Sequence, residues 1–169
     1  MIKAGGITVN NSYEFVKLNT TSNALPTDTS TLLGTEFTST GSDGIKFEVL
    51  QVVAATGSDP DTLYVRYTYT KDATAGEGTL RAPNNTNITN GSVTLTTAAS
   101  DATGVGIVVN VQNGIFYAKG HFVFTEDQSL IVSKYSDTFT GDVGFKVTED
   151  VVTSDDDTSL FDNQGAVPN

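Results

Sequence analysis

A chain of 169 residues with a net charge of −11 and only nine basic side chains lacks the basic surface that neutralises phosphates. This excludes nucleic-acid binding and disfavours an anionic membrane surface. The absence of cysteine excludes disulfides and thiolate metal sites, and it leaves the cellular compartment open.

About one residue in six is threonine, and nine Phe and six Tyr supply core anchors. No stretch of a dozen residues has the apolar spacing of an amphipathic helix without interruption by Gly, Pro or Thr. The composition therefore predicts an all-β protein with long polar loops. The chain starts without the apolar segment of a signal peptide, and no apolar run reaches the length of a membrane span.

Residues 1–30 are predicted to form two short strands around an Asn10–Asn11 turn, followed by a polar stretch over 19–30. Two interpretations of this polar stretch remain open. It is either a loop or linker, or a docking arm that becomes ordered against a partner.

Residues 31–100 are predicted to form a small barrel-like or curved-sheet module. In the strand over 45–53 the apolar side chains change faces after Val49, which predicts a bulge or burial on both faces. Residues 62–70 alternate most clearly as a strand. Residues 71–90 are polar and predicted to leave the sheet as a long exposed loop, and 91–97 return as a strand.

Residues 101–165 are predicted to form a β-meander or sandwich that packs with this module. A turn over 101–106 leads to a strand at 107–112, and residues 114–124 are predicted as one strand whose buried face carries Phe116, Phe122 and Phe124, with Ala118 and Gly120 between them. Further strands are predicted at 129–135 and 143–152. Residues 166–169 are predicted to be a tail, and two alternatives stay open: the chain is either part of a longer polypeptide or a short natural version.

The densest carboxylate group is Asp155, Asp156, Asp157 and Asp162. Calcium takes six to eight oxygen ligands, so this run is a candidate site, but the carboxylate spacing of an EF-hand is absent. A solvated acidic loop is the preferred interpretation, and calcium binding by 155–157 stays open. Ser58, Asp59 and Asp61 surround Pro60 and are interpreted as ordinary turn residues.

His121 is the only histidine, and no Gly-x-Ser-x-Gly elbow accompanies it. One imidazole without thiols does not make a zinc site. Gly104 and Gly106 lack the third glycine and the following helix of a dinucleotide loop. We therefore assign no catalytic, cofactor-binding or metal-binding residue, and predict that the chain is not an enzyme. A pair of carboxylates for glycoside cleavage remains open, although tryptophan, which stacks on sugars, is absent.

Six segments, in order, resemble an uncharacterised domain family of large virion structural proteins from the baseplate and tail-fibre region of contractile-tailed cyanophages. The segments are AATGSDPDTLYVRY (54–67), DATGVG (101–106), VQNGIFYAKGHFV (111–123), LIVSKYSDT (130–138), VGFKVTEDVVT (143–153) and DDTSLFDN (156–163). The resemblance covers about residues 31–165. Members of the family are usually several hundred residues or longer, and residues 1–30 match no part of the pattern.

This resemblance implies a structural component of a phage tail, located in the virion, at the baseplate or tail-fibre attachment. Its expected partners are other virion proteins, met through sheet edges and extended arms, in a symmetric homo-oligomer or on a symmetric ring. Two alternatives stay open. One is a carbohydrate-binding β-sandwich of a host-recognition fibre that binds a surface glycan through Tyr64, Tyr67 or Tyr69. The other is a fragment of a polysaccharide depolymerase.

Overall fold

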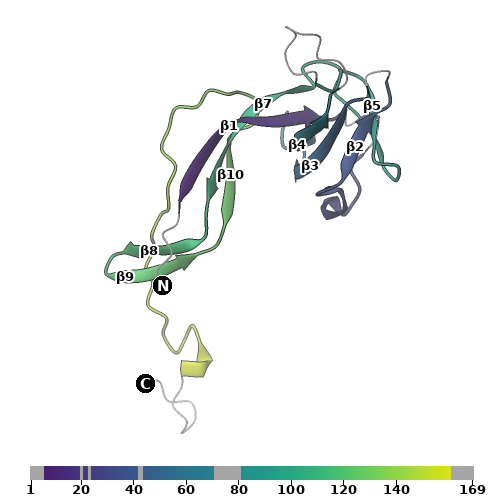
Figure 1. Ribbon diagram of the computed structural model, residues 1–169. Coiled ribbons are helices and arrows are strands. Elements are labelled where there is room, and N and C mark those ends of the chain that lie inside the picture. The colour runs from purple at the N-terminus through teal and green to yellow at the C-terminus, as the bar shows by residue number, and fades with distance from the viewer. Residues whose placement is uncertain (1–5, 20, 23, 42–43, 71–80, 161–169) are drawn as a thin grey trace.

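The computed structural model describes residues 6–19, 21–22, 24–41, 44–70 and 81–160. Within these residues all regular structure is β, apart from two short 3-10 turns, and every strand pair is antiparallel. The prediction of an all-β fold is confirmed. The described chain has a rounded body and an arm that extends from it (Figure 1).

Eight strands form one sheet in the order β10-β7-β1-β4-β3-β2-β5-β6, and two form a separate hairpin, β8-β9. Their bounds are β1 Ile7–Lys17, β2 Glu36–Ser39, β3 Lys46–Val53, β4 Thr62–Tyr69, β5 Asn87–Thr89, β6 Thr94–Thr96, β7 Thr103–Val111, β8 Gly114–Ala118, β9 His121–Thr125 and β10 Gln128–Ser133. The 3-10 turns are η1 (Thr29–Leu32) and η2 (Thr158–Leu160).

The large sheet curves but does not close into a barrel. A single β-bridge between Leu18 and Thr97 joins the end of β1 to the chain just after β6, without a continuous ladder. Of the two predicted forms of this module, the structure has the curved sheet, but the sheet extends beyond residues 31–100 because β1, β7 and β10 also belong to it. The curvature encloses one hydrophobic core between β1, β2, β3, β4, β5 and β6.

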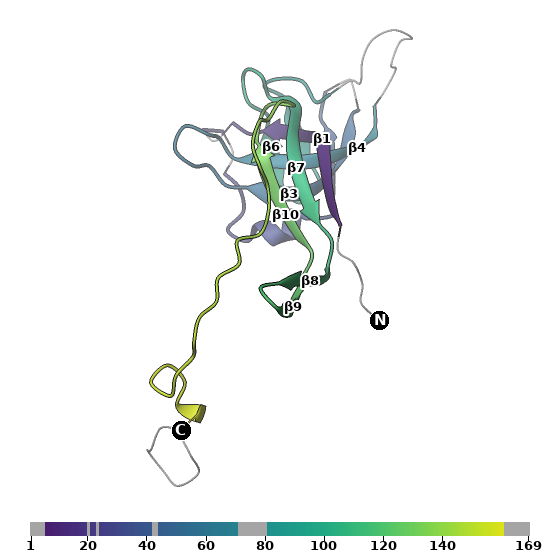
Figure 2. The ribbon, with the colours of Figure 1, turned by 90° about the vertical axis from the view of Figure 1, so that its left-hand side faces the viewer.

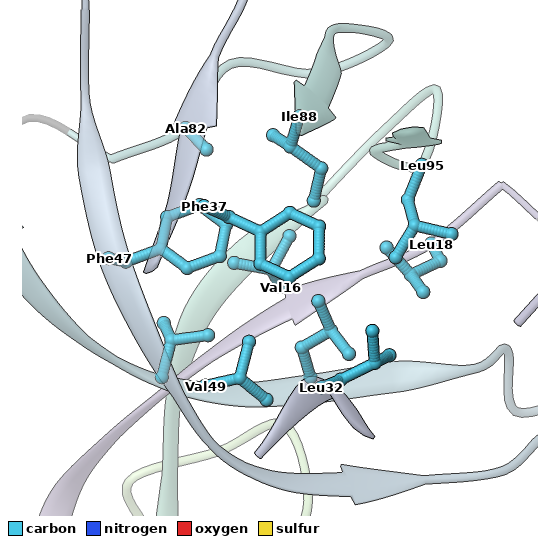
Figure 3. Close-up of a cluster of buried hydrophobic side chains, with 11 residues drawn as sticks. Val16, Leu18, Leu32, Phe37, Phe47, Val49, Ala82, Ile88 and Leu95 are labelled. Carbon is cyan, nitrogen blue, oxygen red and sulfur yellow. The ribbon is translucent and has the colours of Figure 1, made fainter. Parts of the chain in front are cut away.

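Aromatic rings occupy the centre of this core (Figure 3). Phe37 on β2 lies opposite Phe47 on β3, and their rings are stacked with centroids 6.1 Å apart. Tyr67 on β4 places its ring edge-on against Phe47 at 5.7 Å. Ile88 and Leu95 from the short strands β5 and β6 cover the open end of the curve and are fully buried.

The predicted irregularity in β3 is a bulge. The register between β3 and β4 shifts between Val49 and Gln51, so that the side chain of Val49 is buried while that of Leu50 is exposed. The change of apolar face in the sequence therefore has the expected structural cause.

The N-terminal prediction of two strands around Asn10–Asn11 is wrong. A single strand, β1, pairs with β7 along its whole length, from Ile7 opposite Val111 to Val16 opposite Thr103. The register shifts between Asn10 and Tyr13, and Asn10 Oδ1 accepts a hydrogen bond from the Ser12 amide at 3.0 Å. The two asparagines thus form an irregularity within one strand, because both halves pair with the same neighbour.

We define the arm as residues 7–12 of β1, residues 107–111 of β7, β10 and the β8-β9 hairpin, and the body as the rest of the large sheet. β1 and β7 run continuously from the body into the arm, and the hairpin lies at its far end (Figure 1). The segment after β10 runs beside the arm and continues past it to η2 (Figure 2).

Two further predictions about the C-terminal part are wrong. The strand at 128–133 does not continue a meander from β9, because it pairs with β7. Residues 143–152 do not form a strand, because they pair with none of the described strands. The predicted turn at 101–106 is also shorter, since β7 begins at Thr103.

The polar stretch at 71–90 is only partly an exposed loop. Residues 71–80 lie outside the described residues, whereas Ala82 and Ile88 are buried in the core. The amide of Ala82 donates a hydrogen bond to the phenol oxygen of Tyr67 at 3.3 Å. The prediction therefore fails at the end of the stretch, where the chain returns to complete the core.

The phenol of Tyr67 makes stability dependent on alkaline pH. Burial raises the pKa of Tyr67 to about 12, whereas an unfolded tyrosine ionises near pH 10. The protonated folded form therefore contributes its full stabilisation below pH 10, and this is lost as the pH rises towards 12. Burial also raises the pKa of Tyr64 above the ordinary tyrosine range, which adds to the loss.

We expect the free energy of unfolding to fall by about 2–3 kcal/mol between pH 9.5 and 12 on account of Tyr67 alone. Tyr67→Phe keeps the ring against Phe47 and is expected to reduce the pH dependence to the part that is due to Tyr64, as followed by urea denaturation at a series of pH values. Tyr69→Phe, at an exposed position on the same strand, is the control and is expected to keep the wild-type slope. Equal slopes for Tyr67→Phe and wild type would contradict the assignment.

Candidate assembly surface

The β8-β9 hairpin turns at Lys119 and Gly120, which have φ angles of 47° and 90°. Two successive residues with positive φ are typical of the tight hairpin turns whose twist matches that of the strands. The turn places Ile115 opposite Phe124, Phe116 opposite Val123 and Tyr117 opposite Phe122. The predicted single strand over 114–124 is therefore two strands.

This correction changes which side chains share a face. Across the turn the alternation reverses, so Ile115, Tyr117, Phe122 and Phe124 lie together on what we call the outer face. Tyr117, Phe122 and Phe124 are between 63% and 68% exposed. The prediction that Phe122 and Phe124 form core with Phe116 is wrong, since nothing in the described chain covers the outer face.

The opposite, inner face of the hairpin is covered by the C-terminal segment. Phe116 packs edge-on against Phe145 with ring centroids 5.5 Å apart. Val147 lies over the same face and, with Phe116 and Val123, lines an open hollow of about 350 Å³. An ion pair of 3.4 Å between Lys119 and Glu149 also joins the hairpin to this segment. The hairpin thus has one covered and one bare apolar face.

A second apolar surface lies on one face of the arm's three-stranded part. Ile7 and Val9 on β1 lie opposite Val111 and Val109 on β7, and Leu130 on β10 lies beside Val109. We call these five residues the arm strip. Residues 139–145 cross it and leave two open hollows of about 180 and 240 Å³, in which Ile7, Val9 and Leu130 stay half-exposed or more.

The junction between body and arm is held by Lys134 and Tyr135, which follow β10. The hydroxyls of Thr62 and Tyr135 lie 2.9 Å apart, and the Tyr64 hydroxyl donates to the Lys134 carbonyl at 3.1 Å. Lys134 Nζ binds Asp59 Oδ2 at 2.6 Å. The Tyr135 ring packs edge-on against Phe15 at 5.1 Å, with Lys17 Nζ above it at 4.2 Å.

Glycine at 106 allows this close approach. A Cβ at this position would lie 2.6 Å from the Ser133 carbonyl oxygen and 2.7 Å from that of Lys134. Gly104 similarly lies under the ring of Phe15. The two glycines considered above for a phosphate loop therefore lie within β7 and serve the packing of the junction.

The strands of the arm carry no negative charge, although Glu126 and Asp127 lie between β9 and β10, where Asp127 accepts a hydrogen bond from the Asn113 amide at 2.7 Å. All twenty carboxylate side chains lie outside residues 1–13, 102–125 and 128–136. The strands of the arm are built almost entirely from these three acid-free stretches.

The acidic side chains considered for calcium accept hydrogen bonds from residues of their own turn. Asp156 accepts hydrogen bonds from the Thr153 amide at 3.0 Å and hydroxyl at 2.8 Å, and these bonds lower the pKa of its carboxyl. Asp157 accepts from the Ser159 amide at 2.9 Å, and its pKa is also lowered. Asp155 lies in the same turn, and Asp162 is outside the described residues. In the described part of the chain no three acidic or imidazole side chains gather as a metal site requires.

The other candidates are dispersed. Asp59 pairs with Lys134, and Asp61 accepts a hydrogen bond from the Ala55 amide at 2.7 Å in the turn that also contains Ser58. His121 is exposed in β9, next to the hairpin turn and some distance along the chain from these acids. The structure does not bring them together.

The three tyrosines considered for glycan binding differ in exposure. Tyr64 is buried and stacked on Tyr13 at 4.9 Å, and Tyr67 packs in the core. Tyr69 alone of the three is substantially exposed, at 52%. Sequence reasoning missed the exposed face of the hairpin on which Tyr117, Phe122 and Phe124 lie together, and the signal was the Lys119–Gly120 pair halfway along an alternating stretch.

No helix among the residues that the structure covers has the length and hydropathy needed to cross a membrane. Comparison of the chain with protein-family models, with curated proteins and with solved structures found no match.

Proposed function

We propose that this chain is a structural component of a phage tail, at the baseplate or the tail-fibre attachment, and that it assembles with other virion proteins through its arm. The observation that carries the proposal is the β8-β9 hairpin of the arm, whose outer face is bare, with Tyr117, Phe122 and Phe124 between 63% and 68% exposed. Exposed apolar patches of this kind are typical of protein–protein contact. The resemblance of the sequence segments to virion proteins supplies the tail as the place of assembly.

The division into body and arm supports the same proposal. The core of the body is complete, with Phe37, Phe47 and Ile88 fully buried, whereas the hairpin of the arm leaves Phe122 and Phe124 more than 60% exposed. A chain that folds its body alone and completes its arm in contact with other proteins has the properties of an assembly part. The glycan-binding alternative retains only Tyr69 of its three tyrosines as an exposed ring.

Purified phage particles carrying this protein test the proposal. We expect antibodies against the body to label one position at the end of the tail in electron micrographs. Mass spectrometry of gradient-purified tails should find the chain in a fixed ratio to other tail proteins. Recovery of the chain only in the soluble fraction of the lysate would contradict the proposal. Binding of the purified chain to host glycans, lost in Tyr69→Ala, would favour the carbohydrate-binding alternative instead.

A further inference from the structure

We propose that residues 139–149 form a strap that opens reversibly as a unit, while the sheet beneath it stays folded. The strap runs beside the arm towards the hairpin (Figure 2), and its opening uncovers the centre of the arm strip and the inner face of the hairpin. The inference concerns a movement of the isolated chain, and it goes beyond the assembly role proposed above.

The centre of the arm strip is buried by the strap and not by the sheet. Val109 is only 3% exposed. Its neighbours on the same face are Val9 on β1, which is 67% exposed, and Leu130 on β10, which is 55% exposed. Val109 lines both of the hollows that the strap leaves over the arm strip, and Val143 of the strap lines them with it. Side chains of the strap therefore cover Val109, and they have to move away before a large reagent can reach it.

Few contacts hold the strap closed. Phe139, Phe145 and Val147 pack against the arm but remain between 42% and 46% exposed. Within the part of the chain that the structure describes, the strap makes no main-chain hydrogen bond to the arm. Lys119 and Glu149 form an ion pair at its far end, but both side chains are 53% exposed, so solvent screens their attraction. A segment with few buried contacts and no main-chain hydrogen bonds opens at the low end of the range of local stabilities.

The sheet beneath the strap is held more firmly. Along the arm, β7 pairs with β1 on one side and with β10 on the other. The chain before the strap is anchored as well, because Lys134 pairs with Asp59 and the Tyr135 ring packs against Phe15. The strap can therefore leave the arm without breaking a strand pair, and it turns about residues 136–138, between this anchor and the strap.

The far end of the strap is held to the hairpin by an aromatic contact. The ring of Phe145 packs edge-on against Phe116 with centroids 5.5 Å apart, and such a pair contributes more than its buried area alone. Phe116 is not among the described residues that line the two hollows beside Val109. A substitution at Phe116 therefore affects access to Val109 only through movement of the strap as a whole.

Thiol modification at two successive residues of β7 tests the opening. The chain has no cysteine, so Val109→Cys and Val108→Cys each introduce a single thiol at a buried position. Successive side chains of a strand point to opposite faces, so only the thiol at position 109 lies beneath the strap. A polyethylene-glycol maleimide is too large for the hollows of about 180 and 240 Å³ beside this position, so it reacts with the open state alone.

We expect Val109→Cys to react about tenfold or more faster than Val108→Cys in native buffer, with a single rate constant and to completion, as seen by the shift in mass on a gel. Opening of the whole sheet would expose both thiols, and the Val108→Cys rate measures that contribution. Urea denaturation of the two variants establishes that both are folded. Equal rates in the folded variants would overturn the inference. So would a reaction at position 109 that stops at a fixed fraction, because the open and closed chains would then not interconvert.

Phe116→Ala tests whether the strap opens as a unit. Introduced into Val109→Cys, it removes the contact with Phe145 and is expected to raise the reaction rate at position 109 about fivefold or more. Phe122→Ala is the matched control, because it removes a ring of the same size from the exposed outer face of the same hairpin, and it should leave the rate unchanged. An unchanged rate in a folded Phe116→Ala variant, or an equal increase in both variants, would overturn the inference.

Limited trypsin digestion gives a second measure that needs no introduced thiol. Lys146 lies within the strap, whereas Lys134 belongs to the anchor and is held by Asp59. The wild-type chain should therefore be cut after Lys146 well before it is cut after Lys134. Phe116→Ala should accelerate the cut at Lys146 and leave the cut at Lys134 unchanged, and Phe122→Ala should change neither. Cleavage at Lys146 that is no faster than cleavage at Lys134 would contradict an opening of the strap alone.

Opening of the strap changes the apolar surface that the arm presents. In the closed state Val109 and the inner face of the hairpin are covered, and in the open state both are bare. The strap thereby limits the surface available to partner proteins, a consequence that rests on the function proposed above. The two proposals can fail separately. A chain that is found at the tail end but whose strap stays closed keeps its structural role and loses this movement, and a strap that opens in a chain absent from purified tails gives the reverse.

Discussion

Replacement of Phe47 by alanine is expected to lower the free energy of unfolding by about 3–5 kcal/mol. The ring is fully buried and contacts Phe37 by stacking and Tyr67 by an edge-on approach. Its removal loses the transfer free energy of the ring and leaves a cavity between strands β2, β3 and β4, which the paired backbones cannot close. A loss of this size is a large share of the stability of a domain this small.

Urea denaturation followed by circular dichroism measures this loss. Tyr69→Ala is the matched control, because it removes a ring of similar size from an exposed position on the neighbouring strand β4. We expect the control to change the free energy of unfolding by about 0.5 kcal/mol or less. If both variants lose the same amount, the described core is not the main source of the stability of the body.

The body was largely predictable from sequence because its signals are local. Residues 62–69 alternate as a strand, and the bulge at Val49 follows from a change of apolar face within a single strand. What the sequence did not reveal is how the short polar strands contribute. Ile88 lies between Asn and Thr residues, and it is buried only because β5 pairs with β2, about fifty residues earlier.

The N-terminal strand illustrates a different reason for failure. Asn10 and Asn11 suit a hairpin turn and an irregularity within a strand equally well. The choice between them is made by β7, roughly a hundred residues away, which pairs with both halves of β1. Local sequence cannot supply that information.

The hairpin was misassigned because alternation survives a two-residue turn. Lys119 and Gly120 form the turn between the two strands, and the alternation of apolar residues continues through them along the sequence. In the folded hairpin, however, Phe122 and Phe124 lie on the face opposite to Phe116. Lys-Gly is a weaker turn signal than Asn-Gly. As a consequence Phe122 and Phe124 were predicted to be core, and the surface that they form with Tyr117 was missed.

Residues 143–147 carry the alternating pattern of a strand but have no partner strand within the described chain. Val143 and Phe145 instead line the hollows over the arm strip, and Val147 lies over the inner face of the hairpin. The alternating pattern therefore reflects the packing of these side chains against the arm, and not hydrogen bonding to a neighbouring strand. Its position depends on the junction, where Lys134 and Tyr135 fix the direction of the segment.

Gly106→Ala is expected to loosen this junction and to lower the free energy of unfolding by about 1–3 kcal/mol. The added Cβ would meet the carbonyl oxygens of Ser133 and Lys134 at 2.6 and 2.7 Å. These are backbone atoms, so the chain after β10 has to move away from β7. The movement breaks the bond between the Tyr64 hydroxyl and the Lys134 carbonyl and separates Tyr135 from Phe15.

The sign of the change in the free energy of unfolding distinguishes a steric clash at residue 106 from the general effect of replacing glycine by alanine. In the absence of a clash, alanine in place of glycine is expected to stabilise a protein by about 0.4–1 kcal/mol, because it restricts the unfolded chain. Gly144→Ala is the control, since nothing lies within 4 Å of the position of its Cβ. Urea denaturation should therefore show a loss for Gly106→Ala and little change or a gain for Gly144→Ala.

Limited trypsin digestion provides the structural readout. Lys134 is held in the wild type by its ion pair with Asp59 and by the packing of Tyr135. Release of the junction should expose the bond after Lys134 and accelerate its cleavage in Gly106→Ala, whereas Gly144→Ala should be cut there at the wild-type rate. A stabilised Gly106→Ala variant with unchanged cleavage would mean that the segment after β10 does not approach β7 as described. Because the same segment covers the arm strip and the inner face of the hairpin, its release should also expose these two apolar faces.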